Sequence, residues 1–241
     1  MRLLSLCILL FYPILAQSHD FSSWNGLLKD YIHTGNKHAI QLNVVNYQSL
    51  QQDARWHQTL NELKQAHVKT LLTKQDKLAF WINSYNILAV KIVVEHAGIQ
   101  SIKDAGRWYT PIWKEDAGMV AGKVYSLNDI ENNILRPMGE PRIHFAIVCA
   151  SVSCPDLRDE AYQADRLDGQ LNEQVHRFLA NQGKGARLHQ GKLEVSSIFK
   201  WFADDFEHVG GVIAFMQKYS TIKSHPIDGY LDYDWSLNAS Q

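Results

Sequence analysis

The sequence is organised around the stretch LAFWINSYNILAVKIVV, which occupies residues 78–94. These residues are apolar on almost every face of a helix, which is the pattern of a helix buried on all sides. Thr73 and Asp76 precede the stretch with the spacing of a capping box, with Asp76 standing where glutamate is usual. Gly98 follows it, and glycine commonly ends a helix. We therefore predict a capped central helix with the remaining chain packed around it.

Shorter elements are predicted on both sides of this helix. The segment 142–149, RIHFAIVC, has the best strand pattern because it is apolar on both faces from Phe145 onward. Long helices early in the chain and strands later predict the α+β class, with helices packed on a mainly antiparallel sheet. Helices are predicted over residues 24–32, 47–68, 127–136, 167–179, 196–206 and 209–219, and strands over 41–45, 108–125, 142–149, 187–189, 192–195 and 229–234.

The first residues predict export. A basic start at Arg2, an apolar run over residues 3–16 and the small Ala16 have the form of a secretory signal peptide over residues 1–16. An uncleaved anchor is disfavoured, because the run contains Pro13 and falls short of the roughly 20 residues that a spanning helix needs. We expect a periplasmic or secreted protein without stable membrane insertion after cleavage, and one globular domain over residues 17–241.

The composition argues against several classes of function. The chain has 24 basic and 25 acidic residues and a formal net charge of −1, so it lacks the positive charge of a nucleic-acid-binding protein. Its 11 histidines are scattered without the close pairs of a zinc site, and no cofactor fingerprint is present. We expect no metal, no cofactor and no nucleic acid, and a small-molecule or peptide ligand as the partner.

Two asparagines and a glutamate fall at positions predicted to be buried. Asn83 and Asn86 lie three residues apart and so share one face of the central helix. A buried amide without a partner costs about 1–3 kcal/mol, so both side chains must meet polar groups or a ligand. Glu131 falls within the apolar stripe of the helix 127–136, near Arg136 and Arg142. Each residue has a structural interpretation, as a polar network or ion pair, and a functional one.

Cys149 ends the predicted strand, where the chain turns into small polar residues. The end of a rigid element both holds and exposes a side chain, which favours a functional site. His144 is the nearest histidine, and a neighbouring histidine favours the reactive thiolate. Residues an odd number of positions apart face opposite sides of a regular strand. His144 and Cys149 can therefore pair only if the strand bulges or ends before Cys149.

Cys154 offers a second thiol. Pro155 suits the first position of a helix, which would place Cys154 near an N-cap, where the helix dipole stabilises a thiolate. In an exported protein, Cys149 and Cys154 also fit a disulfide that closes a small loop. Three interpretations stay open for the pair: a structural or redox-labile disulfide, a catalytic thiol, or inert buried cysteines.

Five motifs follow one another along the chain. They are WINSYN at residues 81–86, SLNDIE at 126–131 with Leu135 and Arg136 after it, RIHFAIVCAS at 142–151, LEVSSIF at 193–199 and WFADDF at 201–206. Together they resemble the domain of unknown function 547 (DUF547) family over roughly residues 60–210 of this chain. Serine stands at the position of Cys154 in some members of that family, which favours Cys149 as the functional thiol.

The resemblance implies an architecture similar to the papain-like and transglutaminase-like thiol enzymes. Those folds set a nucleophile on a central helix against a histidine on a strand. Residues 81–86 would lie on that helix and His144 on that strand, but Asn83 stands where a cysteine is expected. Either Cys149 has become the nucleophile from another element, or the scaffold binds a ligand without hydrolysis.

The leading hypothesis is a thiol-dependent acyl-transfer enzyme, a hydrolase or transferase that acts on a peptide or amide. Cys149 would attack the substrate, His144 would serve as the base, and Asn83 or Asn86 would orient the imidazole, with Glu131 completing the candidate catalytic set.

Two other functions remain as hypotheses. The alternative is a non-catalytic binding domain of the cell envelope, in which the asparagines, His144 and Glu131 form a polar pocket. A thiol–disulfide role for Cys149 and Cys154 is disfavoured, because four residues separate them rather than the two of the usual redox motif.

Overall fold

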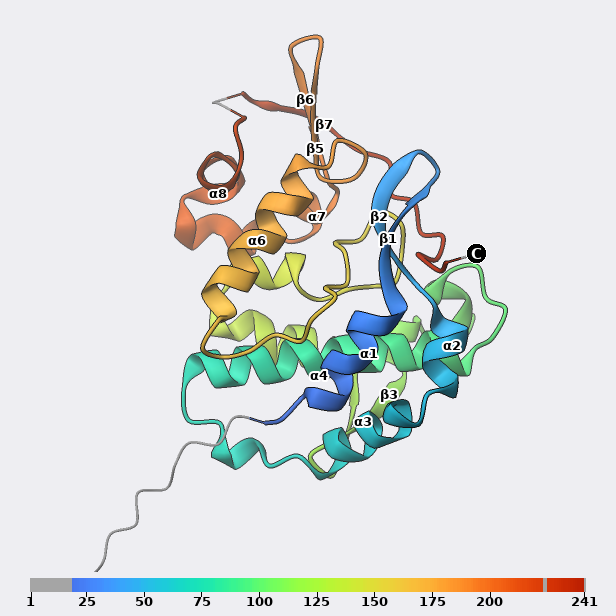
Figure 1. Cartoon of the computed structure of the whole chain (residues 1–241). Helices are drawn as coiled ribbons and strands as arrows, with labels where there is room; N and C mark the ends of the chain where they lie inside the picture. The colour runs from blue at the N-terminus through green and yellow to red at the C-terminus, as the bar shows by residue number, and fades with distance from the viewer. Residues whose placement is uncertain (1–18, 223–224, 241) are drawn as a thin grey trace, which may run out of the picture.

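The structure, a computed structural model, describes residues 19–222 and 225–240, so the predicted signal peptide lies outside the described residues. In Figure 1, helix α4 crosses the width of the molecule, α1 lies across its front, and α6 and the β5–β7 sheet lie above it. The helices are α1 (Ser22–Tyr31), α2 (Tyr47–Gln52), α3 (Ala54–Gln65), α4 (Lys74–Glu95), α5 (Leu127–Ile130), α6 (Leu167–Ala180), α7 (Ile198–Trp201) and α8 (Gly211–Tyr219).

Short helical turns connect these helices. The turn η4 (Glu131–Leu135) is π-helical and continues α5 directly. The 3-10 turns are η1 (Val68–Thr70), η2 (Ile102–Ala105), η3 (Ile112–Lys114), η5 (Arg136–Met138), η6 (Pro141–Phe145) and η7 (Ala203–Val209).

The strands form three separate small sheets in the described part of the chain. Two are antiparallel hairpins, β1–β2 and β3–β4, and the third has the order β5–β6–β7, with β6 and β7 parallel. The α+β class is confirmed, but the helices do not share the single, mainly antiparallel sheet that the sequence suggested. The strands are β1 (Ile32–Lys37), β2 (Ile40–Val45), β3 (Asp116–Val120), β4 (Lys123–Ser126), β5 (Ala186–His189), β6 (Lys192–Val195) and β7 (Ile227–Tyr230).

Helix α4 is the central buried helix that the sequence predicts. Its capping box is formed, because the Asp76 backbone N–H donates to Thr73 Oγ1 and the Thr73 backbone N–H donates to Asp76 Oδ2, each at 3.0 Å. Among the described residues, α4 is the one helix long and apolar enough to cross a membrane. Its most apolar 18-residue window is 89% buried inside the protein, as expected of a core helix.

Most other predicted elements are present with shifted ends. The helix expected over 47–68 is divided into α2 and α3 at Asp53, whose carboxylate accepts a hydrogen bond from the Arg55 backbone N–H at 2.8 Å. Such a side-chain cap favours a new helix start over continuation of the old helix. The hairpin β5–β6 and helix α6 are confirmed.

The strand expected over residues 142–149 is wrong. Pro141–Phe145 form the 3-10 turn η6, and the chain then continues irregularly to Cys149. Apolar runs of this length do not distinguish a strand from other buried segments. Side chains take the place of a neighbouring strand here: Asn86 pairs with the Ala146 carbonyl and the Val148 N–H, and Gln174 donates to the Phe145 carbonyl. The buried backbone is thereby satisfied without a sheet.

This irregular segment connects two apolar clusters. The larger cluster surrounds α4 and includes Ile147 and Val148. The smaller one is rich in aromatic residues, and Phe145 packs there against Phe199 and Phe215 with ring centroids 5.6 Å away in both cases. Each fully buried side chain of this size contributes about 1.5–3 kcal/mol. The residues that lead to Cys149 are therefore anchored firmly.

The C-terminal segment packs alongside the residues that follow Cys149. The Val152 and Ser153 N–H groups donate to the carbonyls of Ser236 and Asp234 at 2.9 and 3.1 Å, and the Asn238 N–H donates to the Ala150 carbonyl at 3.0 Å. These backbone hydrogen bonds bring the end of the chain to the predicted functional region.

Candidate thiol site

A cavity of about 440 Å³ opens where these segments meet. Three of the five predicted site residues, Cys149, His144 and Glu131, line it, together with Tyr85, Tyr233 and Trp235. The cavity therefore unites residues from α4, η4, η6, the segment after it and the C-terminal segment. Asn83 and Asn86 are not among its lining residues.

The Cys149 sulfur is surrounded by hydrogen-bond donors. Ser151 Oγ lies 3.1 Å and the Tyr233 hydroxyl 3.3 Å from Sγ, and the Ser151 backbone N–H also points to it. Burial alone would raise the pKa of this thiol, but hydrogen bonds from Cys154, Ser151 and Tyr233 outweigh burial and lower it to about 7. The thiol of Cys149 is therefore partly ionised to the thiolate near neutral pH.

Cys154 supports this thiolate as a neutral thiol. Both cysteines are free, and the Cys149 backbone N–H donates to Cys154 Sγ at 2.8 Å. Burial and the neighbouring Cys149 raise the pKa of Cys154 well above its usual value. The structure therefore has the two thiols adjacent and unbonded, rather than joined as a disulfide.

A backbone constraint follows Cys149 directly. Ala150 has a φ of +55°, a left-handed conformation that side-chain-bearing residues other than asparagine and aspartate seldom adopt. Such conformations cost about 1–3 kcal/mol and persist where the surroundings impose them. Here the Asn238 N–H donates to the Ala150 carbonyl and supports the turn. The turn fixes the direction in which the chain leaves the thiol.

His144 is held by Asp205, which lies in WFADDF, the last of the five sequence motifs. Its Nε2 lies 2.7 Å from Asp205 Oδ2, and Arg136 binds the same carboxylate through Nε and Nη2 at 2.6 and 2.9 Å. The ring stacks on Phe202 with a centroid distance of 4.0 Å. Burial lowers the pKa of His144, although Asp205 opposes that effect. The imidazole is therefore neutral at pH 7, with the proton on Nε2 facing the carboxylate.

Glu131 is the carboxylic acid of the cavity. Burial raises its pKa to about 7, although the nearby Arg136 opposes this, and the charge of Cys149 adds to the increase. The Tyr85 hydroxyl lies 3.4 Å from Oε2. The residue begins the π-helical turn η4, and π-helical turns occur frequently at functional sites. Both forms of the carboxyl group are accordingly populated near neutral pH.

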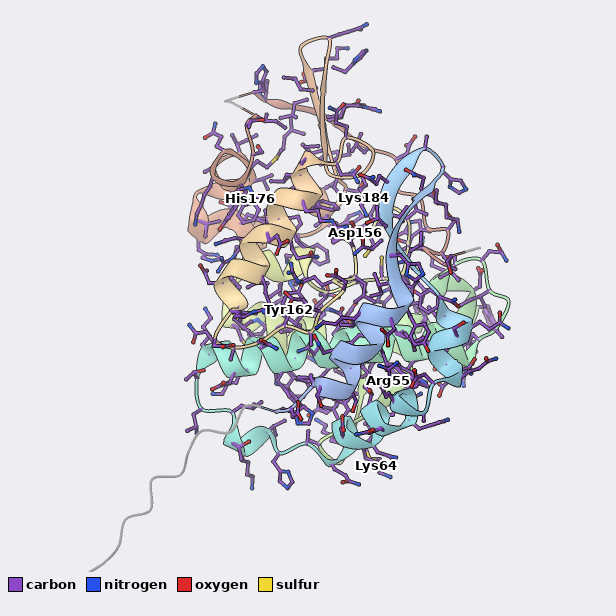
Figure 2. All side chains as sticks on the ribbon, in the orientation of Figure 1. Arg55, Lys64, Asp156, Tyr162, His176 and Lys184 are labelled. Atoms are coloured by element: carbon purple, nitrogen blue, oxygen red, sulfur yellow. The ribbon has the colours of Figure 1, made fainter. Side chains whose placement is uncertain are left out.

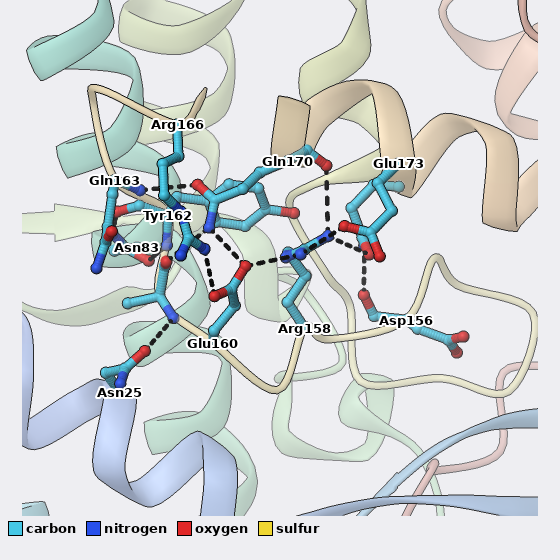
Figure 3. Close-up of polar contacts among 12 residues, drawn as sticks. Asn25, Asn83, Asp156, Arg158, Glu160, Tyr162, Gln163, Arg166, Gln170 and Glu173 are labelled. Atoms are coloured by element: carbon cyan, nitrogen blue, oxygen red, sulfur yellow. Dashed lines mark hydrogen bonds and ion pairs between the residues drawn. The ribbon is translucent and has the colours of Figure 1, made fainter. Parts of the chain in front are cut away.

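Asn83 and Asn86 hold the backbone around the site instead of entering it. Asn83 donates to the Tyr162 carbonyl at 2.8 Å and accepts from its N–H at 3.0 Å, and Figure 3 shows it reaching that segment from α4. Asn86 does the same for Ala146 and Val148 at 2.9 and 3.0 Å. Neither amide is hydrogen-bonded to His144, so the orienting role expected of an asparagine belongs to Asp205 in this structure.

A buried ion pair fixes the segment behind Cys154. Lys184 Nζ lies 2.5 Å from Asp156 Oδ1 and donates to the Cys154 carbonyl at 2.9 Å. Figure 2 places Lys184 and Asp156 next to each other between the β1–β2 hairpin and α6. Removing one partner of a buried pair is strongly destabilising, so this segment is held rigidly.

Sequence reasoning missed several residues of the site. Asp205 lies within the WFADDF motif, but nothing in its spacing indicates that it meets His144. Ser151 lies in the RIHFAIVCAS motif, whereas Tyr233 lies outside every motif and carried no signal. No cysteine, histidine or acidic cluster suited to a metal ion is found within residues 19–222 and 225–240.

Comparison with known proteins identifies one family. Residues 69–179 match the family described as "Protein of unknown function, DUF547", so the membership that the sequence motifs indicate is confirmed and this part of the chain belongs to that family. The matched segment contains Glu131, His144 and Cys149, while Asp205 and Tyr233 lie beyond it. No curated protein and no solved structure matches the chain.

Proposed function

We propose that this protein is a thiol-dependent acyl-transfer enzyme that acts on amide or related acyl substrates, with Cys149 as the nucleophile. The observation that carries the proposal is the set of hydrogen bonds from Ser151, Tyr233 and Cys154 to the Cys149 sulfur within a cavity. The thiolate is the reactive form of cysteine, and these hydrogen bonds favour that form near neutral pH. A buried structural cysteine would need no such donors.

The first half of the reaction uses Cys149 and Glu131. The thiolate attacks the acyl carbon, and the carbonyl electrons move to the oxygen. Collapse of this intermediate breaks the bond to the leaving nitrogen, which takes a proton from the Glu131 carboxylic acid. A thioester on Cys149, a free amine and a Glu131 carboxylate remain. A pKa of about 7 for Glu131 suits this proton transfer.

The second half uses His144. Its Nε2 is engaged by Asp205, and no described residue forms a hydrogen bond with Nδ1, which is an acceptor in the neutral ring. Nδ1 takes a proton from water, or from an amine in a transferase, as that nucleophile attacks the thioester. The Cys149 thiolate then leaves, and the proton passes from His144 through solvent to Glu131. Asp205 and Arg136 position the imidazole throughout.

The proposal includes a papain-like arrangement in a modified form. Helix α4 occupies the core, as the central helix of those enzymes does. His144 lines the same cavity as the thiol and is paired with the acidic residue Asp205. Here the thiol comes from the segment after η6 instead of from the helix. The signal-like residues 1–16 support a periplasmic or secreted place of action.

Thiol alkylation tests the nucleophile. In the folded chain, iodoacetamide is expected to label Cys149 with an apparent pKa of about 7, below the value of about 8.5 for a free cysteine. Cys154 should be labelled only after unfolding. With a p-nitrophenyl ester, one equivalent of nitrophenolate should be released in a burst, and the acyl group should be found on Cys149 by mass mapping.

The matched variants are Cys149→Ser and Cys154→Ser. The first should abolish both labelling and the acyl adduct, while the second should retain labelling of Cys149 with a higher apparent pKa. A titration midpoint of Cys149 at or above that of free cysteine would refute the proposal.

A binding domain is the second candidate, and one observation favours it: no hydrogen bond joins the side chains of His144 and Cys149, both of which are described. In that case the cavity would hold its ligand without covalent chemistry. The Cys149→Ser protein would then keep its ligand affinity, and the ester would give no acyl adduct on the natural chain.

The Tyr233 hydroxyl provides a separate prediction. Replacing Tyr233 with phenylalanine removes one donor to the sulfur, and a hydrogen bond to a charged group contributes about 1.5 kcal/mol, so the pKa of Cys149 should rise from about 7 to about 8. The alkylation profile measures this directly. Tyr230→Phe is the control, because Tyr230 is 42% exposed and does not line the cavity. An unchanged profile in Tyr233→Phe would remove Tyr233 from the site.

A further inference from the structure

We propose that the thiol site selects substrates that carry a carboxylate, which Lys103 binds at an aromatic rim of the cavity. This inference rests on the proposed function, because it names the substrate class of the same site. Among the described residues that line the cavity, Lys103 is the only lysine or arginine. Its position and its lack of a counter-ion carry the inference.

Lys103 is held in place without being neutralised. It belongs to η2, where the carboxylate of the neighbouring Asp104 is occupied by the backbone N–H groups of Gln100 and Ser101 at 3.0 and 2.9 Å. The Lys103 ammonium lies 3.6 Å from the centroid of the Trp235 ring, a cation–π contact that orders the side chain. No acidic side chain in the described residues forms an ion pair with it, so its charge is available to a ligand.

The other charged groups near the cavity are already accounted for. Asp205 is bound by both Arg136 and His144. The Cys149 thiolate repels an anion close to it, whereas Glu131 enters the proposed reaction as a neutral acid. A substrate carboxylate is therefore attracted toward the rim and away from the thiol, which orients the acyl group toward Cys149.

Aromatic rings surround Lys103 and provide a surface for the rest of the substrate. Trp235 lies at the centre, with its ring centroid 4.6 Å from Tyr233, 5.6 Å from Trp113 and 5.9 Å from Trp201. Trp201 is 47% exposed, although it is a large apolar side chain. A mostly apolar cavity with one well-placed charged group is the usual form of a small-ligand site. A single ammonium suits a monoanion, and we infer an N-acyl amino acid or a short peptide with a free carboxyl group.

A pair of thiol reagents that differ only in charge tests this inference. N-iodoacetyl-phenylalanine carries a carboxylate, and its amide does not; both are used with and without a glycine spacer. The natural chain should react at Cys149 about three- to fivefold faster with the carboxylate reagent, as expected for a partly exposed ion pair. In Lys103→Gln this ratio should fall to about one, and raised salt should reduce it in the natural chain. The ratio is used because it cancels any general change in thiol reactivity.

Lys114→Gln is the matched control. Lys114 is exposed, carries the same charge, follows Trp113 directly and does not line the cavity. Its removal should leave the ratio as in the natural chain. The inference would be overturned if the natural chain and Lys103→Gln showed the same preference for the carboxylate reagent. It would also be overturned if Lys103→Gln and Lys114→Gln lost that preference equally.

A second measurement does not depend on a reactive thiol. In Cys149→Ala, quenching of tryptophan fluorescence reports binding of N-acetyl-phenylalanine and of its amide at the rim that contains Trp235. The carboxylate form should bind about three- to fivefold more tightly, and the preference should vanish in Cys149→Ala with Lys103→Gln. If Cys149 is not alkylated but the carboxylate form still binds more tightly, the proposal of an enzyme is refuted and the inferred class of ligand is retained. Equal binding of the acid and its amide would refute the substrate class.

Discussion

Replacing Asn86 with alanine is expected to destabilise the protein by about 3–5 kcal/mol, since it leaves two buried backbone groups unpaired at about 1–3 kcal/mol each and removes the amide itself. The affected groups are the Ala146 carbonyl and the Val148 N–H. This loss should lower the melting temperature by roughly 10 °C in a chain of this length. Urea unfolding followed by circular dichroism measures it.

Asn83→Ala is the matched comparison, because Asn83 makes the same two kinds of hydrogen bond with Tyr162. The two variants should lose similar stability. Only Asn86→Ala should also change the alkylation profile of Cys149 in the folded state, because Val148 precedes the thiol directly. If both variants were as stable as the natural chain, the two amides would not be the anchors described above. If both variants changed the alkylation profile of Cys149 equally, the effect of Asn86 would not be confined to the segment next to the thiol.

Replacing Asp205 with asparagine is expected to cost roughly 2–3 kcal/mol of stability at neutral pH, because it leaves Arg136 and the buried His144 without their shared carboxylate. It should also lower the rate of acyl transfer, because His144 loses the partner that fixes its tautomer. Chemical denaturation and the decay of the Cys149 acyl adduct measure the two effects separately. Asp204→Asn is the control, since Asp204 is exposed and forms no ion pair among the described residues.

The stability difference depends on pH in a defined direction. The hydrogen bond from His144, with the pairing to Arg136, holds the pKa of Asp205 below its usual value even though burial opposes this. A carboxylate whose pKa is lowered on folding adds stability above its unfolded pKa of about 3.9 and loses it as the pH falls toward the folded value. The stabilities of the natural chain and Asp205→Asn should therefore begin to converge as the pH falls below about 4, and the difference should keep shrinking toward the folded pKa. A difference that grew on acidification would contradict the ion pair.

The central helix was predictable because its evidence is local. Residues 78–94 are apolar on nearly every face, and Thr73 and Asp76 are close enough in sequence to be recognised as a cap. The segment 142–149 was not predictable, because its conformation depends on Asn86 and Gln174, which lie far away in sequence and replace a neighbouring strand. A local apolar pattern contains no information about such partners.

The site was predicted only in part, for the same physical reason. Cys149, His144 and Glu131 stand out because their residue types are unusual within buried apolar patterns. Asp205 lies 61 residues after His144, and Tyr233 lies 84 residues after Cys149, so tertiary folding alone brings them together. The parity argument that separated His144 from Cys149 does not apply, because the segment between them is not a strand.

The docking of the C-terminal segment against residues 150–153 has a consequence for biosynthesis. A chain emerges from the ribosome with its N-terminus first, so Cys149 is made well before Tyr233 and Asn238. Until these late residues arrive, the thiol lacks the Tyr233 hydroxyl and the Ala150 turn lacks its support. A chain truncated before Tyr233 therefore lacks one of the hydrogen bonds that lower the pKa of Cys149. Under the proposed function, the full reactivity of Cys149 is reached only after Tyr233 and Asn238 have been synthesised and have packed against this segment.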